Sequence, residues 1–129
     1  MNKSDFTIDC TGDVVVGDTI CYTESVWGGT YQKPENLGSR TIIAEVVKDS
    51  YGVKKQQHTF TLSVINSYGV KPIQEKIKIR RKGRNVYKNG TRRLPWKCKG
   101  ARTLALNEKH ARGGQARAAR QIRIETKQE

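Results

Sequence analysis

The stretch HTFTLSVI at residues 58–65 decides the fold expected of this chain, because apolar and polar side chains alternate along it. Phe60, Leu62 and Val64 fall on one side of an extended backbone, together with His58, and the hydroxyl side chains between them fall on the other. Alternation with a period of two is typical of a strand in an antiparallel sheet that buries one face.

Three further stretches have a comparable pattern. They are VVVGDTICY at 14–22, the apolar run at 41–48 and IQEKIKIR at 73–80. With the strand expected at 57–66, they predict an antiparallel meander of about four or five strands, and a sheet of that size usually curls into a barrel or packs on another element. The glycine-rich segment at 23–39 predicts a long connection between the first two strands.

An internal repeat lies within these strands. Asp49-Ser-Tyr-Gly-Val-Lys54 is echoed by Asn66-Ser-Tyr-Gly-Val-Lys71. Asp and Asn side chains can hydrogen-bond their own backbone in a turn, and glycine supplies a positive φ there. Each copy therefore predicts a turn that follows a strand.

The stretch GDVVVGDTI at 12–20, the long first loop and the strands joined by short turns resemble the SH3-like small barrels, the class that includes KOW and Tudor modules. The resemblance covers residues 12 to 80. It implies a mainly β chain in which an SH3-like barrel, expected at residues 1–80, is followed by a basic extension at 81–129. That extension is expected to form a β-hairpin and a short helix.

The excess positive charge of the chain lies in its C-terminal part. The whole chain has 25 Lys and Arg against 12 Asp and Glu, a net charge of +13. Residues 1–74 hold 7 basic and 8 acidic residues, which leaves 18 basic and 4 acidic residues for 75–129, a net charge of +14. Such an asymmetry indicates a polyanionic partner, of which nucleic acid is the commonest. An acidic protein surface and a solvated charged tail are the alternatives.

The segment RRKGRNVYKNGTRR at 80–93 carries the densest positive charge. Asn89-Gly90 is a strong signal for a type I′ hairpin turn, so residues 86–88 are expected to pair with residues 91–93 and to project cations from a two-stranded ribbon. Tyr87 either packs or stacks on an unpaired base, and these alternatives stay open. Trp96 is expected mainly to cap the barrel.

The last part of the chain predicts helices. TLALNEKHAR at 103–112 contains good helix formers, and Gly113-Gly114 ends the pattern. Beyond it, Arg117, Arg120 and Arg123 recur every third residue and share one helical face. The apolar face there is small, so this segment is expected to become ordered on binding.

The candidate nucleic-acid-binding residues are the cations of the basic half together with one aromatic. They are Lys76, Lys78, Arg80, Arg81, Lys82, Arg84, Tyr87, Lys88, Arg92, Arg93, Lys97, Lys99, Arg102, Arg112, Arg117, Arg120 and Arg123. Lys76, Lys78 and Arg80 are expected to form one cationic strand face.

Catalytic groups are scarce, and we predict no enzyme, no cofactor and no metal site. His58 is expected in the core or at a sheet edge, and His110 on the surface. Asp13 and Asp18 are an odd number apart, so on a regular strand they would point to opposite faces and could not share Mg²⁺. The three cysteines match neither a disulfide framework nor a zinc pattern and are expected to be free thiols.

These observations predict a non-enzymatic, largely sequence-nonspecific DNA-binding protein that acts through phosphates. Double-stranded DNA is the favoured ligand and RNA is possible. The alternative is an adaptor that binds RNA, a ribosome or RNA polymerase, and a third possibility is an inhibitor of an acidic protein. No signal or membrane segment is found, so the chain is expected to be soluble and cytoplasmic. The sequence does not determine the oligomeric state.

A neutral SH3-like module with a very basic extension also resembles the small early DNA-binding proteins of T-even-type bacteriophages, including transcription modulators of the MotB type. That resemblance implies a role in altering transcription or the nucleoid of a bacterial host, and hence a place in the host cytoplasm.

Overall fold

A computed structural model of the chain describes residues 2–51, 58–98 and 100–111. Its elements, in order, are the 3-10 helix η1 (Lys3–Asp5), β1 (Ile8–Asp9), β2 (Thr19–Gly29), β3 (Pro34–Tyr51), β4 (His58–Gly69), β5 (Lys78–Lys82), the helix α1 (Gly83–Tyr87) and β6 (Thr91–Arg93). Residues 100–111 are also helical. Among the predicted binding residues, Lys99, Arg112, Arg117, Arg120 and Arg123 lie outside the described residues.

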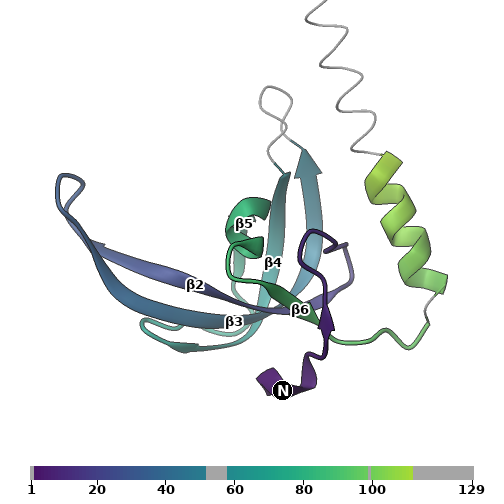
Figure 1. Cartoon of the computed structure of the whole chain (residues 1–129), viewed down its shortest axis with the longest axis horizontal. Helices are drawn as coiled ribbons and strands as arrows, with labels where there is room; N and C mark the ends of the chain where they lie inside the picture. The colour runs from purple at the N-terminus through teal and green to yellow at the C-terminus, as the bar shows by residue number, and fades with distance from the viewer. Residues whose placement is uncertain (1, 52–57, 99, 112–129) are drawn as a thin grey trace, which may run out of the picture.

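The strands form one six-stranded antiparallel sheet in the order β1-β6-β2-β3-β4-β5. The predicted mainly β fold is confirmed. The central strands β2, β3 and β4 are the long ones, and the short strands β1 and β5 lie at the two edges (Figure 1). Residue 80, after which the basic extension was expected to begin, lies within β5. Strand β6 also belongs to this sheet.

The main core lies on one face of the sheet. Alternate residues of the long strands point into it: Ile20 and Tyr22 of β2, Ile42, Ala44 and Val46 of β3, and Phe60, Leu62 and Val64 of β4. Val86 of α1 and Val14 of the loop before β2 pack against these strand residues, and both are fully buried. Burial of one such side chain is worth about 1.5–3 kcal/mol, so the alternation in β4 is a strong determinant of register.

A smaller cluster covers one end of the opposite face. Phe6, Cys21 and Ile43 are buried there, with Ile65 and Leu94 packed against them. The segment around η1 therefore lies over the sheet at this end. Thr59, Thr61 and Ser63 lie farther along β4, toward the other end of the same face.

The predicted long loop at 23–39 is wrong. Strand β2 continues to Gly29 and β3 begins at Pro34, so most of this segment forms a paired hairpin arm that extends from the rest of the sheet (Figure 1). Gly29, with φ of 78°, starts the tight turn at the tip. The glycines that suggested a loop instead permit close packing, since a Cβ on Gly28 would lie 2.8 Å from Leu37 Cδ1.

The first predicted strand is also displaced. Residues 14–18 form a loop, and β2 begins only at Thr19. Val14 and Val15 are both fully buried, which a regular strand with one core face does not allow. The backbone N–H of Asp18 bonds to the carbonyl of Val15, and this turn directs both valines inward.

The two copies of the repeat lie largely in strands rather than turns. Asn66–Gly69 ends β4 and pairs with residues 40–43 in the middle of β3, so the turn predicted there is wrong, although Gly69 has the positive φ expected of it, 113°. Asp49–Tyr51 belongs to β3, and the remainder of the first copy lies outside the described residues. Backbone pairing with a neighbouring long strand has outweighed the local turn preference.

The hairpin predicted around Asn89-Gly90 is wrong. Residues 83–87 form α1, and Thr91–Arg93 pairs with β2 and β1. Gly90 has φ of 84°, but Asn89 does not adopt the positive φ that a type I′ turn needs. Val86 decides the outcome because its side chain is fully buried, and the Thr91 hydroxyl donates to its carbonyl at 2.6 Å.

The strand predicted at 73–80 is shifted toward the C-terminus, since β5 covers Lys78–Lys82. Lys76 lies before it with φ of 68°, so it is not part of a cationic strand face with Lys78 and Arg80. Within the described residues, we find no helix with the length and apolar character needed to cross a membrane.

The three cysteines are free, with Cys10 and Cys21 buried and Cys98 exposed. Burial raises the pKa of Cys10 to about 12 and also raises that of Cys21. Both thiols are therefore protonated near neutral pH, and the thiolate is the reactive form.

We expect one thiol per chain to react within minutes with a chromogenic disulfide reagent at pH 8, and all three to react in denaturant. The Cys98→Ala variant should lose the fast phase and keep the two slow thiols. Rapid reaction of a second thiol in the native wild-type protein would contradict the burial of Cys10 and Cys21.

Candidate nucleic-acid interface

A buried ionic network attaches the segment after β6 and the helix at 100–111 to the loop at 13–18. Asp18, whose side chain is fully buried, accepts hydrogen bonds from Arg102 Nε at 3.0 Å and from Trp96 Nε1 at 2.6 Å. Its second oxygen accepts from Arg102 Nη2 and from the backbone N–H of Val15, both at 3.0 Å. The carboxylate is thus surrounded by donors, which offsets the cost of removing its charge from water.

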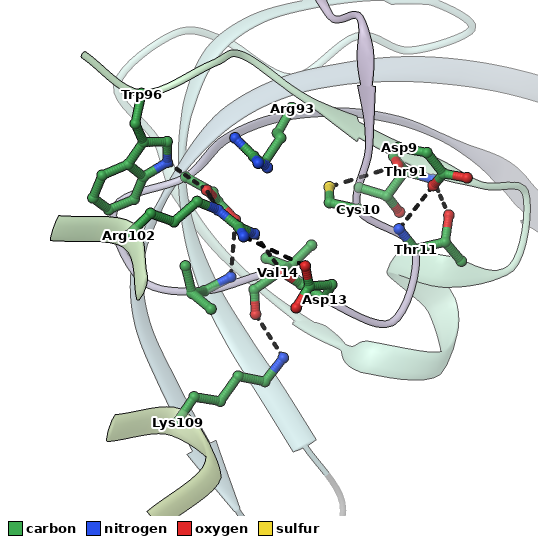
Figure 2. Close-up of polar contacts among 12 residues, drawn as sticks. Asp9, Cys10, Thr11, Asp13, Val14, Thr91, Arg93, Trp96, Arg102 and Lys109 are labelled. Carbon is green, nitrogen blue, oxygen red and sulfur yellow. Dashed lines mark hydrogen bonds and ion pairs between the residues drawn. The ribbon is translucent and has the colours of Figure 1, made fainter. Parts of the chain in front are cut away.

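Arg102 also binds the loop through Asp13. Its Nη2 donates to the carbonyl of Asp13 at 2.7 Å, and its Nη1 lies 3.4 Å from the Asp13 carboxylate. Figure 2 shows Arg102 and Trp96 pointing into the same small region from two different segments. The hydrogen bond to Asp18 is the main reason why the pKa of Arg102 is raised.

Lys109, two turns farther along the helix, makes a second attachment. Its Nζ donates to the carbonyl of Val14 at 2.7 Å (Figure 2). The same Nζ lies 5.8 Å from the centre of the Phe60 ring. Burial lowers the pKa of this ammonium group. Sequence reasoning missed Lys109, because its spacing of seven from Arg102 marks a helical face only after Arg102 is known to be buried.

These contacts show the surroundings of four residues that the sequence analysis discussed. Arg102, predicted to bind nucleic acid, is buried and bound to Asp18, and this contact attaches the helix to the loop at 13–18. Asp13 and Asp18 do not point to opposite faces, because neither lies in a strand and both contact Arg102. Trp96 packs against Gly17, where a Cβ would lie 2.7 Å from Trp96 Cη2, as expected of a capping residue.

Replacing Arg102 by alanine leaves the Asp18 carboxylate buried without its ionic partner. We expect a loss of about 3–5 kcal/mol in the free energy of unfolding, measured by urea denaturation. The helix should also become sensitive to trypsin. As a control, Arg84→Ala removes an exposed arginine and should cost less than about 0.5 kcal/mol. An Arg102→Ala protein as stable as the Arg84→Ala protein would contradict the network.

Exposed cations gather on the open face of the sheet, opposite the main core. Because Phe60 and Leu62 point into the core, Thr59, Thr61 and Ser63 point to the other face. Opposed residues on adjacent strands share a face, and Thr61 lies between Arg80 of β5 and Lys48 of β3. Lys82 and Lys78 lie opposite Thr59 and Ser63 in the neighbouring rows.

We call this surface the basic sheet face and define it by Lys48, Lys78, Arg80, Lys82, Thr59, Thr61 and Ser63. Its four cations are exposed, and Glu45, opposite Ser63, is the carboxylate in these three rows of residues. Sequence reasoning found the cations of β5 but missed Lys48, because only the strand register places it across β4 from them.

Two other predicted cations lie close to β5, one on the helix α1, which packs against this strand, and one directly after that helix. Arg84 and Lys88 are exposed and four residues apart, so they lie on one side of the helix. Arg81, by contrast, points to the opposite face of β5 and binds the carboxylate of Glu24 at 3.0 Å. Arg40 and the Tyr22 hydroxyl also bind Glu24, which makes Arg81 part of a structural cluster.

The remaining predicted residues are dispersed. Arg92 is exposed in β6 opposite Asp9, at the other side of the sheet. Arg93 is partly buried and donates to the carbonyl of Leu94. Lys76 and Lys97 are exposed. Tyr87 packs edge-on against Phe60, with ring centres 6.0 Å apart, and its hydroxyl accepts from the N–H of Val14. Of the two alternatives for Tyr87, the structure therefore supports packing.

His58 lies beside Asp49, with 3.6 Å between Nε2 and a carboxylate oxygen, at the core side of β4. Its ring contacts Phe60 with centroids 4.1 Å apart. In the part of the chain that the structure describes, no three His, Cys, Asp or Glu side chains gather in a way that could hold a metal ion.

Comparison with known proteins assigns a family. The model of a family described as "Domain of unknown function (DUF7699)" matches residues 10–96, which run from the end of β1 to Trp96. The chain belongs to this family. The match includes β2 to β6 and α1 but leaves out β1, so the family unit corresponds to most of the sheet and to the main core.

The chain is also similar to "Zinc finger CCCH domain-containing protein 62" of Oryza sativa subsp. japonica, with 40% identity over 130 residues. That alignment covers 97% of this chain but 18% of the rice protein, so this chain corresponds to a small part of a much longer protein. No solved structure matches the chain significantly.

Proposed function

We propose that this chain is a non-enzymatic module that binds nucleic acid through the basic sheet face. The observation that carries the proposal is the placement of Lys48, Lys78, Arg80 and Lys82 on one exposed face. These cations can contact phosphates, and the hydroxyls of Thr59, Thr61 and Ser63 between them can donate to phosphate oxygens.

The alternative role for charges on β5 is to keep an edge strand from pairing with another molecule. That role requires charge on β5 itself and gives no reason for Lys48, which lies two strands inward. A phosphate-binding surface accounts for the charges on β5 and for Lys48 on β3. Arg84 and Lys88 extend the positive charge around the edge of the sheet onto α1.

The relative from rice supports the same proposal through its name. Zinc-finger domains recur in proteins that recognise DNA or RNA, and a module within such a protein would add affinity for the same ligand. Phosphate contacts alone do not distinguish duplex DNA, the ligand favoured by our sequence analysis, from RNA. A role in host transcription, which the resemblance to phage early proteins implies, stays a prediction.

Reversing three charges on the basic sheet face tests the proposal. We expect Lys78→Glu, Arg80→Glu and Lys82→Glu together to weaken binding more than tenfold and to reduce the slope of log K against log salt by about 3. The measurement is fluorescence anisotropy of labelled duplex DNA, single-stranded DNA and duplex RNA at several salt concentrations. The substituted strand remains charged, so its edge stays protected.

The matched control is Lys3→Glu, Lys33→Glu and Lys71→Glu, which changes the net charge equally at exposed lysines that are not among the residues of the basic sheet face. We expect the control to change the salt slope by less than about 1. If the two triple variants lose the same amount of affinity, the overall charge of the chain determines binding and the basic sheet face does not.

A further inference from the structure

A small pocket lies where the hairpin arm leaves the sheet and α1 crosses beside it. It has a volume of about 200 Å³, and Trp27, Ser25 and Glu24 of β2, Arg81 of β5, and Asn85 and Lys88 at α1 help to line it. Pockets for drug-sized ligands are roughly 300–1,000 Å³, so this one suits a single flat ring system.

Trp27 is the unusual member of the pocket. Its side chain is 60% exposed, although it lies in a strand of the sheet and next to Val26, which is buried. The pairing of β2 with β3 is irregular at this point, passing from Val26 opposite Gly38 to Trp27 opposite Asn36 and skipping Leu37. Such bulges increase the local twist and redirect side chains near binding sites.

The polar groups of the pocket divide into two kinds. Glu24 is already engaged by Arg40, Arg81 and Tyr22, so it holds the floor of the pocket rigid and leaves little capacity for a ligand cation. Asn85 and Lys88 are exposed at the rim and bring an amide and an ammonium group. A ligand that fits has a flat aromatic part for Trp27 and an anionic part for Lys88.

We propose that this pocket takes one unstacked base of a single-stranded nucleic acid, with the base on the Trp27 ring and a neighbouring phosphate on Lys88 and Arg84. The inference rests on the proposed function and adds to it a contact that only strands with unpaired bases can make. Bases within a duplex are stacked on each other and cannot reach Trp27, whereas single strands bind to protein aromatic rings through this kind of stacking.

The test measures binding of a labelled oligothymidylate of about 12 nucleotides, and of a DNA duplex of the same length, to the full chain. Trp27→Ala should weaken binding of the single strand by about tenfold, and Trp27→Phe should restore part of it. Duplex binding should change by less than about twofold, because phosphate contacts on the basic sheet face remain. Tryptophan emission of the wild-type protein should fall on addition of the single strand.

Tyr31→Ala is the matched control, since Tyr31 is a fully exposed aromatic at the tip of the same arm and outside the pocket. It should leave both affinities unchanged. If Trp27→Ala binds the single strand as tightly as wild type while the triple Glu variant of the basic sheet face binds weakly, the pocket inference is wrong and the proposed function stands. If the wild-type protein binds neither nucleic acid, the proposed function fails, and the pocket inference fails with it.

Discussion

The buried carboxylate of Asp18 connects parts of the chain that are far apart in the sequence. It receives hydrogen bonds from Val15 in its own loop, from Trp96 after the last strand and from Arg102 in the helix at 100–111. An ionised group with no water around it is stable only when such donors are present, and loss of any one of them exposes the cost of its burial. The loop before β2 and the C-terminal helix are therefore interdependent.

Two separate sets of buried or partly buried contacts, around Asp18 and around Glu24, determine which cations of the basic half are available to a ligand. Arg102 and Lys109 bind the loop at 13–18, and Arg81 pairs with Glu24. Lys78, Arg80 and Lys82 point away from the core and remain exposed. The surface proposed to bind phosphates consists of the exposed cations alone. The net charge of the basic half does not show which cations are exposed and which are bound inside the protein.

The arm and the basic sheet face are two consequences of the same long strands. Strand β3 runs for 18 residues, from Pro34 in the arm to Tyr51 beyond Lys48. At one end it pairs with β2 to present Trp27, and at the other it brings Lys48 across β4 from Arg80. A single strand therefore links the proposed stacking pocket to the proposed phosphate-binding surface, and the sheet holds both in a defined relation.

Much of the β structure could be predicted from the sequence, because the alternation of Phe60, Leu62 and Val64 follows directly from the geometry of a half-buried strand. The charge asymmetry between residues 1–74 and 75–129 follows equally directly from the sequence, since it needs only a count of charged residues. Local signals failed where long-range pairing opposed them: Asn66–Gly69 pairs with β3 instead of turning, and burial of Val86 prevents a hairpin at Asn89-Gly90.

What the sequence by itself determined is the mainly β class, the strand at 58–66 and the location of the excess positive charge. Only the tertiary structure decided that Arg102 is buried, that Lys48 joins the cations of β5, and that Trp27 lines a pocket with Lys88. The physical reason is that alternation and charge are properties of neighbouring residues, whereas an ion pair or a shared face requires segments about 30 to 80 positions apart to meet. The free energy of such long-range contacts depends on how deeply the residues are buried, and burial is established only when the chain folds.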